Sequence, residues 1–432
     1  MSIILLLGGT EPGLGTITYT VEAQWQGAAT SPIIFDTCLF GDGCEFVDPL
    51  DVDWTSAEVA EIQNISRIRI VRGRDDNLTS LGMGECQITV EDNAGVYNPN
   101  NSSSPLAAVL RPMQWVRVTA EVTDSGGVSL GVQTMYEGLI RSIDYKQDPG
   151  RGFATITCGD AFFWFNRNVP VFVNQGRDTT TGEVVTTALD VVGWSSAKRT
   201  VDTGDVIPSP GVSNPQGGST ALNIFQQLME IARGDLFVTR DGDVVFYDRD
   251  RRALAADSAS YNNSAVAATG TTDVERVRNK ATVTRQTDVG DFTSTWTDGL
   301  SVADYGQQDF GEISSAIIYD QAQALGLAQW LVFQRSNPNV PFRALRVVVN
   351  TLGTAAKANA AITTEISDRL TITDATIGTS GKAYYVEGLQ HDIIASGTTK
   401  HDVTMALAPN YIDALVLDDA SRGRLGYEAL AY

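Results

Sequence analysis

The sequence contains few of the residues on which catalytic and metal centres depend. Its 432 residues include two histidines and four cysteines, and no two cysteines are spaced as CxxC. Structural zinc sites need clusters of Cys and His ligands, so this composition argues against one. Cys38 and Cys44 flank the segment LFGDG, a spacing that fits either a small disulfide loop or two free thiols in a turn. Cysteine usage therefore leaves the redox compartment open.

Basic residues are also scarce. Lys and Arg number 31 against 52 Asp and Glu, which gives a net charge of −21, and neither Lys nor Arg precedes position 67. Binding to nucleic acid depends on cations that displace counterions from phosphates, so this balance argues against stable DNA or RNA binding. An acidic surface instead favours the passage of nucleic acid without adhesion.

Long apolar runs are missing as well. The sequence has no stretch of about 18 consecutive apolar residues, so it predicts no transmembrane helix. The N-terminal run Ile3–Leu7 ends at two glycines and has no basic residue before it. A secretory signal needs a basic start and a longer apolar core. We expect a β-strand or an inserted arm there, in a protein that is soluble or belongs to a soluble assembly.

What the sequence does contain is material for β-structure. Only 19 % of the residues are charged, and Thr, Ser, Asn and Gly fill the difference, which suits strands and turns. Between positions 66 and 165, alternating segments predict five or six antiparallel strands. The prolines Pro99, Pro105 and Pro112 shape the loops and edges between them, because proline fixes φ and lacks a backbone donor.

Residues 166–260 show a different pattern. Positions 166–218 are rich in Thr, Gly, Pro and Ser and lack periodicity, which predicts a linker or a small inserted region. The segment STALNIFQQLMEIARG then predicts a helix, capped by Ser219 or Thr220 and stopped by Gly234. Two strands follow, joined at Asp241-Gly242, a dipeptide that favours a type I′ hairpin.

Residues 261–410 return to the β pattern and add two helices. YDQAQALGLAQWLVFQRSNP predicts one helix, with Asp320 and Gln323 as a capping box, and TAAKANAAITTEIS predicts another. The segments DRLTITD, KAYYVEGLQHDII and KHDVTMALAP predict three further strands. The fold class is therefore mainly β (α+β), with an N-terminal arm and acidic loops at 1–65 and an exposed tail at 411–432.

His391 and His401 are the titratable residues that most suggest chemistry. They lie on successive predicted strands, and Asp392 and Asp402 follow them directly. Cross-strand pairing would permit a metal site or an acid–base pair. No third ligand of suitable type lies nearby in the sequence, so we prefer to interpret both histidines as polar strand positions.

Other chemistry has weaker support. The acidic residues Glu45, Asp51 and Asp53 lack the alternation and glycine placement of a calcium loop, so a solvated acidic loop is preferred. Neither histidine has a GxSxG partner, and no phosphate-binding GxxxxGK[ST] loop occurs. The run Phe162–Phe165 fits a sugar-stacking surface or, preferably, a core plug at the end of a strand. The sequence thus predicts no catalytic residue, no metal site and no cofactor, and leaves binding residues unknown.

Several short motifs follow one another in a distinctive order. Arg72-Gly73-Arg74 ends one strand, Gly84 to Asn93 forms the next, and Asn98-Pro99, Ser104-Pro105 and Leu110-Arg111-Pro112 mark the loop after it. Further on come DLFVTRDGDVVFYDR, SVADYGQQDF and YYVEGLQHDI. This order resembles the minor tail proteins of long-tailed bacteriophages over roughly residues 66–410. No single motif is specific, and their order carries the resemblance.

The resemblance implies a fold and a role. Such proteins are homotrimeric hubs of the tail tip or baseplate, and each chain carries two related β-barrels. Residues 66–165 and 261–410 would form these barrels, with 166–260 as a helix-containing inserted region. The resemblance places the chain in the virion at the tail tip. It implies partners in the distal tail protein ring, the tape-measure protein and the central fibre, with transient DNA passage and no specific DNA binding.

Three points stay open at the level of sequence. The arginines Arg72, Arg74 and Arg111 could form a solvated strand face or bridge carboxylates, either of a neighbouring chain or within the barrel. A receptor- or carbohydrate-binding tail protein is the alternative function, and it would use Phe162–Phe165 and the strand AYYVEG. A cell-wall hydrolase is a third hypothesis, for which the sequence lacks the residues.

Overall fold

The fold is described from a computed structural model. It describes residues 3–5, 13–25, 54–55, 59–74, 82–148, 150–166, 179–207, 220–249, 251–262, 266–272, 274–287, 289–336, 339–374, 379–395 and 399–409. The predictions about Cys38 and Cys44, about the acidic loop from Glu45 to Asp53, and about the tail at 411–432 lie outside these residues.

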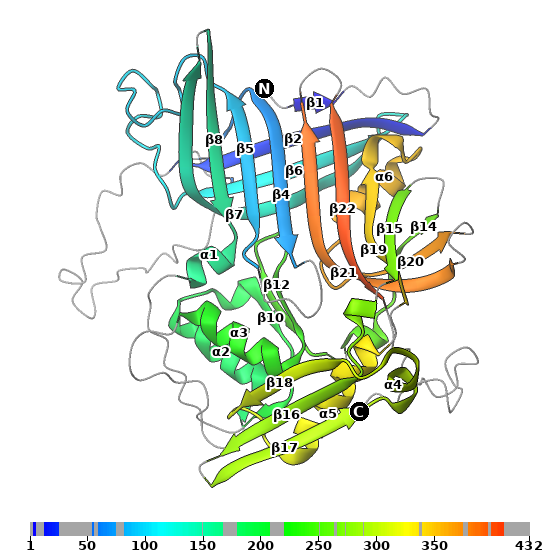
Figure 1. The fold of residues 1–432 in the computed structure, drawn as a ribbon. Helices are drawn as coiled ribbons and strands as arrows, with labels where there is room; N and C mark the ends of the chain where they lie inside the picture. The colour runs from blue at the N-terminus through cyan, green and yellow to red at the C-terminus, as the bar shows by residue number, and fades with distance from the viewer. Residues whose placement is uncertain are drawn as a thin grey trace, which may run out of the picture.

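Most strands belong to one fourteen-stranded sheet (Figure 1). Its main path is β1-β2-β6-β7-β8-β5-β4-β21-β22-β19-β15; β3 pairs with β2, and β20 pairs with both β21 and β14. The bounds are β1 (Ile3–Leu5), β2 (Leu14–Gln24), β3 (Val59–Glu61), β4 (Ile65–Gly73), β5 (Glu85–Glu91), β6 (Trp115–Asp124), β7 (Ser129–Asp148), β8 (Arg151–Gly159), β14 (Asp257–Asn262), β15 (Val266–Thr272), β19 (Asn339–Val348), β20 (Arg369–Asp374), β21 (Thr379–Ile394) and β22 (Lys400–Pro409).

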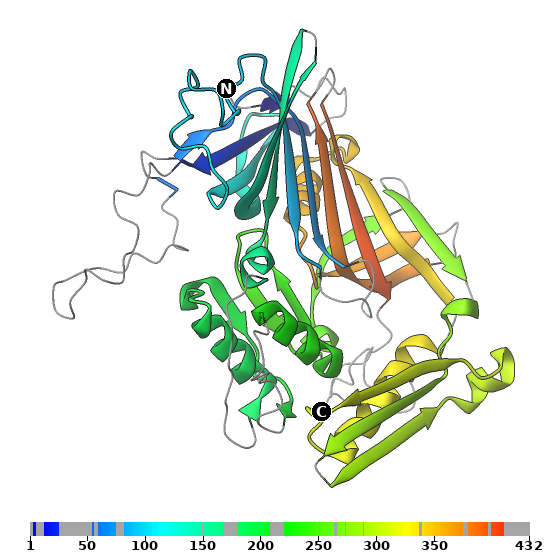
Figure 2. The same ribbon diagram turned by 60° about the vertical axis from the view of Figure 1, so that its left-hand side comes forward.

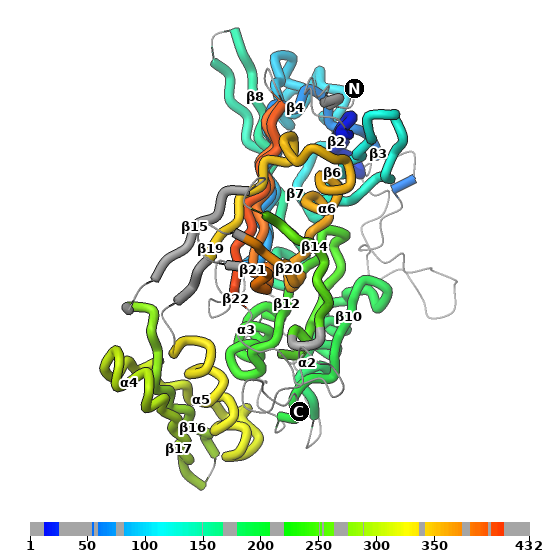
Figure 3. Tube along the Cα trace, turned by 90° about the vertical axis from the view of Figure 1, so that its right-hand side faces the viewer, coloured from blue at the N-terminus to red at the C-terminus, as the bar shows by residue number. Residues whose placement is uncertain are grey.

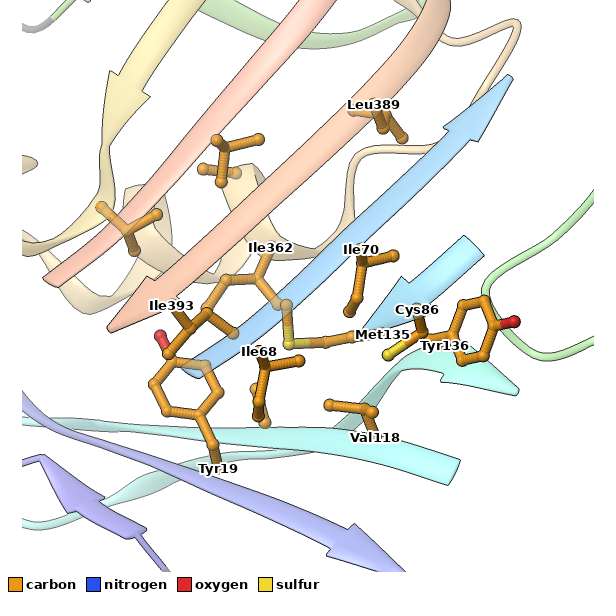
Figure 4. Close-up of a cluster of buried hydrophobic side chains, with 14 of the residues drawn as sticks. Tyr19, Ile68, Ile70, Cys86, Val118, Met135, Tyr136, Ile362, Leu389 and Ile393 are labelled. Carbon is orange, nitrogen blue, oxygen red and sulfur yellow. The ribbon is translucent and has the colours of Figure 1, made fainter. Parts of the chain in front are cut away.

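The alternation of side chains decides which residues enter the core of this sheet. On β4, Ile68 and Ile70 face inward and are fully buried, whereas Arg67 faces solvent. The long strand β7 pairs with β6 along its first half and with β8 along its second. The sheet therefore curls at β7, and its two parts enclose one core. Tyr19 of β2 and Val118 of β6 thereby lie across one core from the isoleucines of β4 (Figure 4).

The prediction of two separate barrels is wrong for the described residues. The strands follow an open path from β1 to β15, and the two β-rich blocks are joined edge to edge where β4 pairs with β21. Strand alternation specifies which face is buried but not which strand is the neighbour, so the sequence pattern could not reveal this seam. At the seam Gly73 has φ 83°, and a Cβ there would lie 2.3 Å from the carbonyl oxygen of Glu387.

Helix α6 (Ala355–Thr363) covers one opening of the curled sheet. It packs against β2, β6 and β7, and its inward face is made of small or branched apolar residues that are buried, namely Ala355, Ala358, Ala361 and Ile362. Small alanines allow the helix to approach the strands closely. The short 3-10 helix η4 (Val349–Thr351) leads into it.

The inserted region forms a small α/β unit below the large sheet. Helices α2 (Thr181–Val191) and α3 (Ala221–Ala232) accompany a three-stranded sheet of β10 (Arg199–Val201), β13 (Val244–Tyr247) and β12 (Asp235–Val238). Of the two alternatives predicted for 166–218, a linker or a small inserted region, helix α2 favours the inserted region, although no helix was predicted there. Its capping box, in which Thr180 and Glu183 bond each other's backbone N–H groups, is a sequence signal that the weak hydrophobic periodicity obscured.

The predicted helix and hairpin of the inserted region are both present, with different ends. Thr220 caps α3 as predicted, but Arg233 takes the left-handed conformation at its C-terminus, with φ 54°. The β12–β13 turn is not type I′, because only Gly242 has a positive φ and Thr239 N–H bonds to Asp243 O across a longer loop. The remaining short elements there are α1 (Ala161–Phe165), β9 (Thr179–Thr180), η1 (Ser196–Lys198), β11 (Val206–Ile207) and η2 (Arg251–Leu254).

A third unit, residues 274–336, lies between β15 and β19 in sequence. Its sheet has the order β17-β16-β18 and is covered on one face by helix α5. The views in Figures 1, 2 and 3 place it at the end of the molecule away from the N-terminal strands. Its elements are η3 (Val274–Arg276), β16 (Lys280–Thr287), β17 (Gly290–Thr297), α4 (Gly299–Tyr305), β18 (Asp309–Ser315) and α5 (Gln321–Arg335), the last capped by Asp320 as predicted.

Candidate functional site

A cluster of buried charges joins the large sheet to the inserted region. We call it the junction cluster, and its members come from β4, β12, η2, β21 and the loop after α6. They are Arg72, Arg74, Asp235, Arg252, Glu365 and Glu387.

The centre of the junction cluster is a closed set of ion pairs. Arg74 Nε donates to Glu387 Oε2 at 2.8 Å, and its Nη2 donates to Asp235 Oδ1 at 2.8 Å. Arg252 pairs with the other oxygen of each carboxylate. Two arginines and two carboxylates thus neutralise one another, and Ser367 Oγ adds a hydrogen bond of 2.7 Å to Asp235. Charges buried in this way are stable only when each has its partner.

The surroundings of Glu387 set its ionisation. Its side chain is fully buried, and burial alone would raise the pKa of the carboxyl group. Arg252 and Arg74 outweigh burial and bring the pKa of Glu387 down to about 2. The carboxylate therefore stays charged through the physiological range, as the two guanidinium groups beside it require.

Arg72 occupies a second position in the junction cluster. Its Nη1 donates to Glu365 Oε1 at 2.6 Å and to the carbonyl of Val238 at 3.2 Å. The side chain is 2 % exposed, so Arg72 belongs neither to a solvated strand face nor to a contact with another chain. The solvated face and the contact with another chain are therefore wrong for Arg72, whereas the interpretation that it bridges carboxylates of its own chain is confirmed; Arg74, 12 % exposed, is likewise paired inside its own chain.

Three of the sequence motifs meet at this cluster. Arg74 belongs to the RGR motif, Asp235 to DLFVTRDG and Glu387 to YYVEG. Their separations of 161 and 313 positions conceal from the sequence that they share one set of ion pairs. Three motifs far apart in the sequence thus form one contact, between the sheet and the inserted region.

The space beside the junction cluster is small. A cavity of about 20 Å³ is lined by Arg74, Asp160, Glu387 and neighbouring apolar residues, which is room for roughly one water molecule. The buried Asp160 carboxylate accepts N–H bonds from Gly84 and Phe162, yet burial raises its pKa to about 7. The cavity is too small for an organic cofactor or a substrate.

The two histidines meet in the core of the large sheet. His391 Nδ1 lies 3.0 Å from His401 Nε2, and His401 Nδ1 lies 2.7 Å from the hydroxyl of Tyr19. All three side chains are at most 1 % exposed. Burial, and for His391 also its neighbours His401 and Arg72, lowers the pKa of both imidazoles, to about 3 in His401. The chain of hydrogen bonds is therefore neutral at pH 7.

The predicted cross-strand proximity of the histidines is confirmed, but their surroundings differ from both interpretations. Asp392 and Asp402 are cross-strand neighbours on the opposite, outer face of the sheet. There Asp392 binds Arg67 and Asp402 binds Arg346. No group of three or more His, Cys, Asp or Glu in the described residues could hold a metal ion. The histidines are hydrogen-bonding members of the core, which strand alternation could have shown, since each shares a face with apolar neighbours.

The aromatic run at 162–165 is part of a helix rather than of a strand. Asp160 caps α1, and Phe162 and Phe165 are 2 % and 0 % exposed. Phe165 packs edge-on against Trp194 and Phe225. The preferred interpretation as a core plug is confirmed for these two rings, and they are not available to stack on a sugar.

The exposed apolar side chains are concentrated in one unit. Fifteen large hydrophobic side chains are exposed in the described residues, and eight of them lie in the third unit: Val289, Phe292, Trp296, Leu300, Tyr305, Tyr319, Leu325 and Phe333. Another three, Val128, Leu130 and Val132, lie on the β6–β7 hairpin. Exposed apolar groups of this kind mark surfaces that bind other proteins. None of the helices in the described residues is long and apolar enough to cross a membrane.

The comparisons with known proteins agree on the fold. The chain is similar to a tail protein of Neisseria meningitidis MC58, with TM-score 0.52 and 12 % identity, covering 90 % of this chain and 96 % of that one. It is also similar to the 43 kDa tail protein of prophage MuSo2 from Shewanella oneidensis, with TM-score 0.52 and 15 % identity, covering 82 % and 97 %.

The chain has the fold of a phage tail protein. The same tail-protein fold occurs in the PdpA–VgrG complex of Francisella, with TM-score 0.50 and 10 % identity, covering 93 % of this chain and 59 % of that one. No protein-family model and no curated protein matches the sequence. The resemblance to phage tail proteins that the order of motifs indicated is thus confirmed at the level of fold, at sequence identities of 10 % to 15 %.

Proposed function

We propose that this chain is a structural protein of a bacteriophage tail tip, a hub that joins the tail tube and distal tail ring to the central fibre. The observation that carries the proposal is the tail-protein fold, which covers nearly the whole of this chain and of its Neisseria counterpart. A fold alone does not fix a function. The remaining support comes from the chemistry of the described residues.

The buried ionisable groups serve the architecture. The arginines and carboxylates of the junction cluster neutralise one another, and the two histidines bond to each other and to Tyr19. Each of these buried groups has its partner within the fold, which supports a role in assembly.

The overall charge fits a protein beside moving DNA. A net charge of −21 repels phosphates at short range, so a channel lined by such chains lets DNA pass without adhesion. In the proposed arrangement three chains form a ring, and the β-rich blocks 66–165 and 261–410 line it. The partners are the distal tail protein ring, the tape-measure protein and the central fibre.

The aromatic residues on which the receptor- or carbohydrate-binding alternative depends are buried or half-buried. Phe162 and Phe165 are buried, Phe163 and Trp164 are half-buried and pack against a hydrophobic core, and Tyr384 and Tyr385 of the AYYVEG strand are 1 % and 5 % exposed. Sugars stack on exposed aromatic faces, so neither group forms such a surface. We therefore retain the tail-tip hub as the single proposed function.

The test is the position and copy number of the chain in assembled particles. Electron cryomicroscopy of tails carrying an added tag on this chain is expected to show density for three copies in a ring at the tip. Gel-shift measurements with the purified protein are expected to show no DNA retardation at physiological salt. Tails complete without the chain, or a tag located along the tube instead of at its end, would contradict the proposal.

A further inference from the structure

Strand β17 is an open edge in the most apolar exposed part of the molecule. Its only strand neighbour in the described residues is β16, so about half of its backbone donors and acceptors point outward. Of its eight residues only Ser294 is buried. Natural edge strands are usually protected against pairing by lysine, proline or a bulge. β17 has none of these, and its one charge, Asp291, lies near its end.

The other edge of the same sheet is protected. The pairing of β18 with β16 shifts register between Lys280 and Thr282, and Gly311 there has φ 100°. A bulge of this kind twists an edge away from straight pairing. The contrast within one three-stranded sheet indicates that β17 is kept free for a partner strand and β18 is not.

The sequence of β17 is complementary to itself. We propose that β17 pairs antiparallel with β17 of a second copy of this chain, about a two-fold axis through Ser294. In this register Phe292 of each copy lies opposite Trp296 of the other copy on one face of the sheet. On the other face, Thr293 of each copy lies opposite Thr295 of the other. Phe292 and Trp296 are 43 % and 42 % exposed, so both have surface to bury.

These cross-strand pairs belong to the types that stabilise sheets. Aromatic pairs and threonine pairs on opposite strands attract each other. Within one chain, β17 already pairs its threonines with those of β16, where Thr284 and Thr293 hydroxyls lie 3.0 Å apart. The new register also places Asp291 opposite Thr297, so no two carboxylates of the strand face each other.

Helix α5 fits the same two-fold arrangement. It packs over β16 and β17, on the face that carries Ser294. Strands lie about 4.8 Å apart, so two copies joined at β17 bring their α5 helices to roughly 10 Å, the distance at which helices pack. Leu325, 37 % exposed, lies on the flank of α5 between its buried face and solvent. It provides the contact between the helices.

The exposed side of α5 is the side on which the second copy would lie. Gln323, on the other flank of the helix, donates to the carbonyl of Val206 in the inserted region. Figure 1 shows β18 on the side of the inserted region and β17 on the outer side. Leu325 therefore lies on the open flank, beside the free edge. The inference is independent of the three-fold ring in the proposed function.

Light scattering of the purified full chain tests the contact. The double variant Phe292→Lys/Trp296→Lys is expected to weaken self-association on the order of 100-fold, because it removes both cross-strand aromatic pairs and adds like charges. The matched control is Leu300→Lys, a change of the same kind on α4, 83 % exposed and outside the proposed contact. The wild type and the control are expected to have twice the mass of the double variant.

The outcome also separates this contact from the proposed ring. A trimeric ring that pairs through β17 has six copies of 46.4 kDa and falls to three in the double variant, whereas a chain that forms no ring falls from two to one. Because each copy carries −21 charges, association is expected to tighten as salt rises. An unchanged mass in a double variant with wild-type circular dichroism overturns the proposal.

A cysteine at the axis tests the register. Ser294→Cys places two thiols opposite each other on the two-fold axis and is expected to give a covalent dimer under mild oxidation. Thr297→Cys, three positions away, faces Asp291 of the second copy and is expected to give none. The unsubstituted chain, oxidised in parallel, accounts for the native cysteines. Equal cross-linking by both variants, or by neither, contradicts pairing centred on Ser294.

Discussion

Two clusters of buried polar side chains in this protein differ in the charge that they require. The junction cluster holds full charges that cancel one another between the large sheet and the inserted region. The Tyr19–His401–His391 chain holds neutral rings that bond in series inside one core. The first requires every member to be ionised, and the second requires every member to remain uncharged.

The difference follows from what each group connects. A contact between two separately packed units gains specificity from charges, because a misplaced unit would leave buried charges without partners. Inside a single apolar core, a charge would find no compensating partner, so neutral hydrogen bonds are the stable solution. The two groups are therefore expected to fail under different conditions, and the following experiments exploit this.

The largest effect is expected at Glu387. Glu387→Gln removes one carboxylate and leaves Arg74 and Arg252 with excess positive charge in a buried place, which costs roughly 3–5 kcal/mol of unfolding free energy. The matched control is Asp392→Asn on the same strand, whose carboxylate binds the half-exposed Arg67 at the surface. Exposed pairs contribute at most about 1 kcal/mol.

The unfolding free energies of Glu387→Gln and Asp392→Asn are measured by urea denaturation, monitored by circular dichroism. A loss for Glu387→Gln no larger than that for Asp392→Asn would show that the junction cluster contributes no more than a surface ion pair.

A smaller effect is expected from acid on the histidine chain. Both imidazoles have a folded pKa below the ordinary 6.5, so the unfolded chain binds more protons and stability falls as pH drops below 6.5, down to about 3 for His401. For His401 alone the loss at pH 5 is roughly 2 kcal/mol. The stabilising ionisation of Glu387 is lost only between pH 4.5 and about 2.

The pH dependence of unfolding separates the two groups. Wild type is expected to lose more stability between pH 7 and pH 5 than His391→Gln/His401→Gln, which has no imidazole to protonate there. Glu387→Gln is expected to keep the wild-type slope over that range, because Glu387 titrates lower. Parallel curves for wild type and the double histidine variant would contradict the neutral-chain interpretation.

The smallest of these effects is expected from the ionisation of Asp160. Burial raises the pKa of this carboxyl group to about 7, so the folded state holds the proton more tightly and stability falls as pH rises from 3.8 towards 7. Between pH 6 and pH 8 the loss is about 1 kcal/mol. Asp160→Asn is expected to abolish this slope, measured by thermal unfolding at both pH values, and an unaltered slope would assign it to another group.

The sequence predicted local structure well where short-range signals are strong. Helix α5 begins after its capping residue Asp320, and α3 begins after Thr220, as propensity and capping indicate. The weakly amphipathic α2 was missed because its apolar positions are diluted by threonine. Such a helix is stabilised by tertiary packing, which periodicity alone does not show.

Long-range pairing was beyond sequence reasoning. The partners of Arg74 could not be identified from the sequence because Asp235 and Glu387 lie 161 and 313 positions away. The missing information is which strand is the neighbour, since pattern determines face but not partner. The histidines differ, because alternation alone places each on a face with apolar residues, and only their mutual hydrogen bond needed the structure.

The seam between β4 and β21 has a consequence for biosynthesis. Arg67 and Asp392 pair across it from 325 positions apart, so a ribosome working at ~5–20 residues per second needs roughly 20–60 s to supply the second strand after the first. During that interval β4 is a bare edge on a growing polypeptide. Its outward-facing Arg67 and Arg69 then oppose pairing of this edge with other chains, because charged side chains protect edge strands from aggregation. Once β21 has been synthesised and pairs with β4, Arg67 forms its ion pair with Asp392.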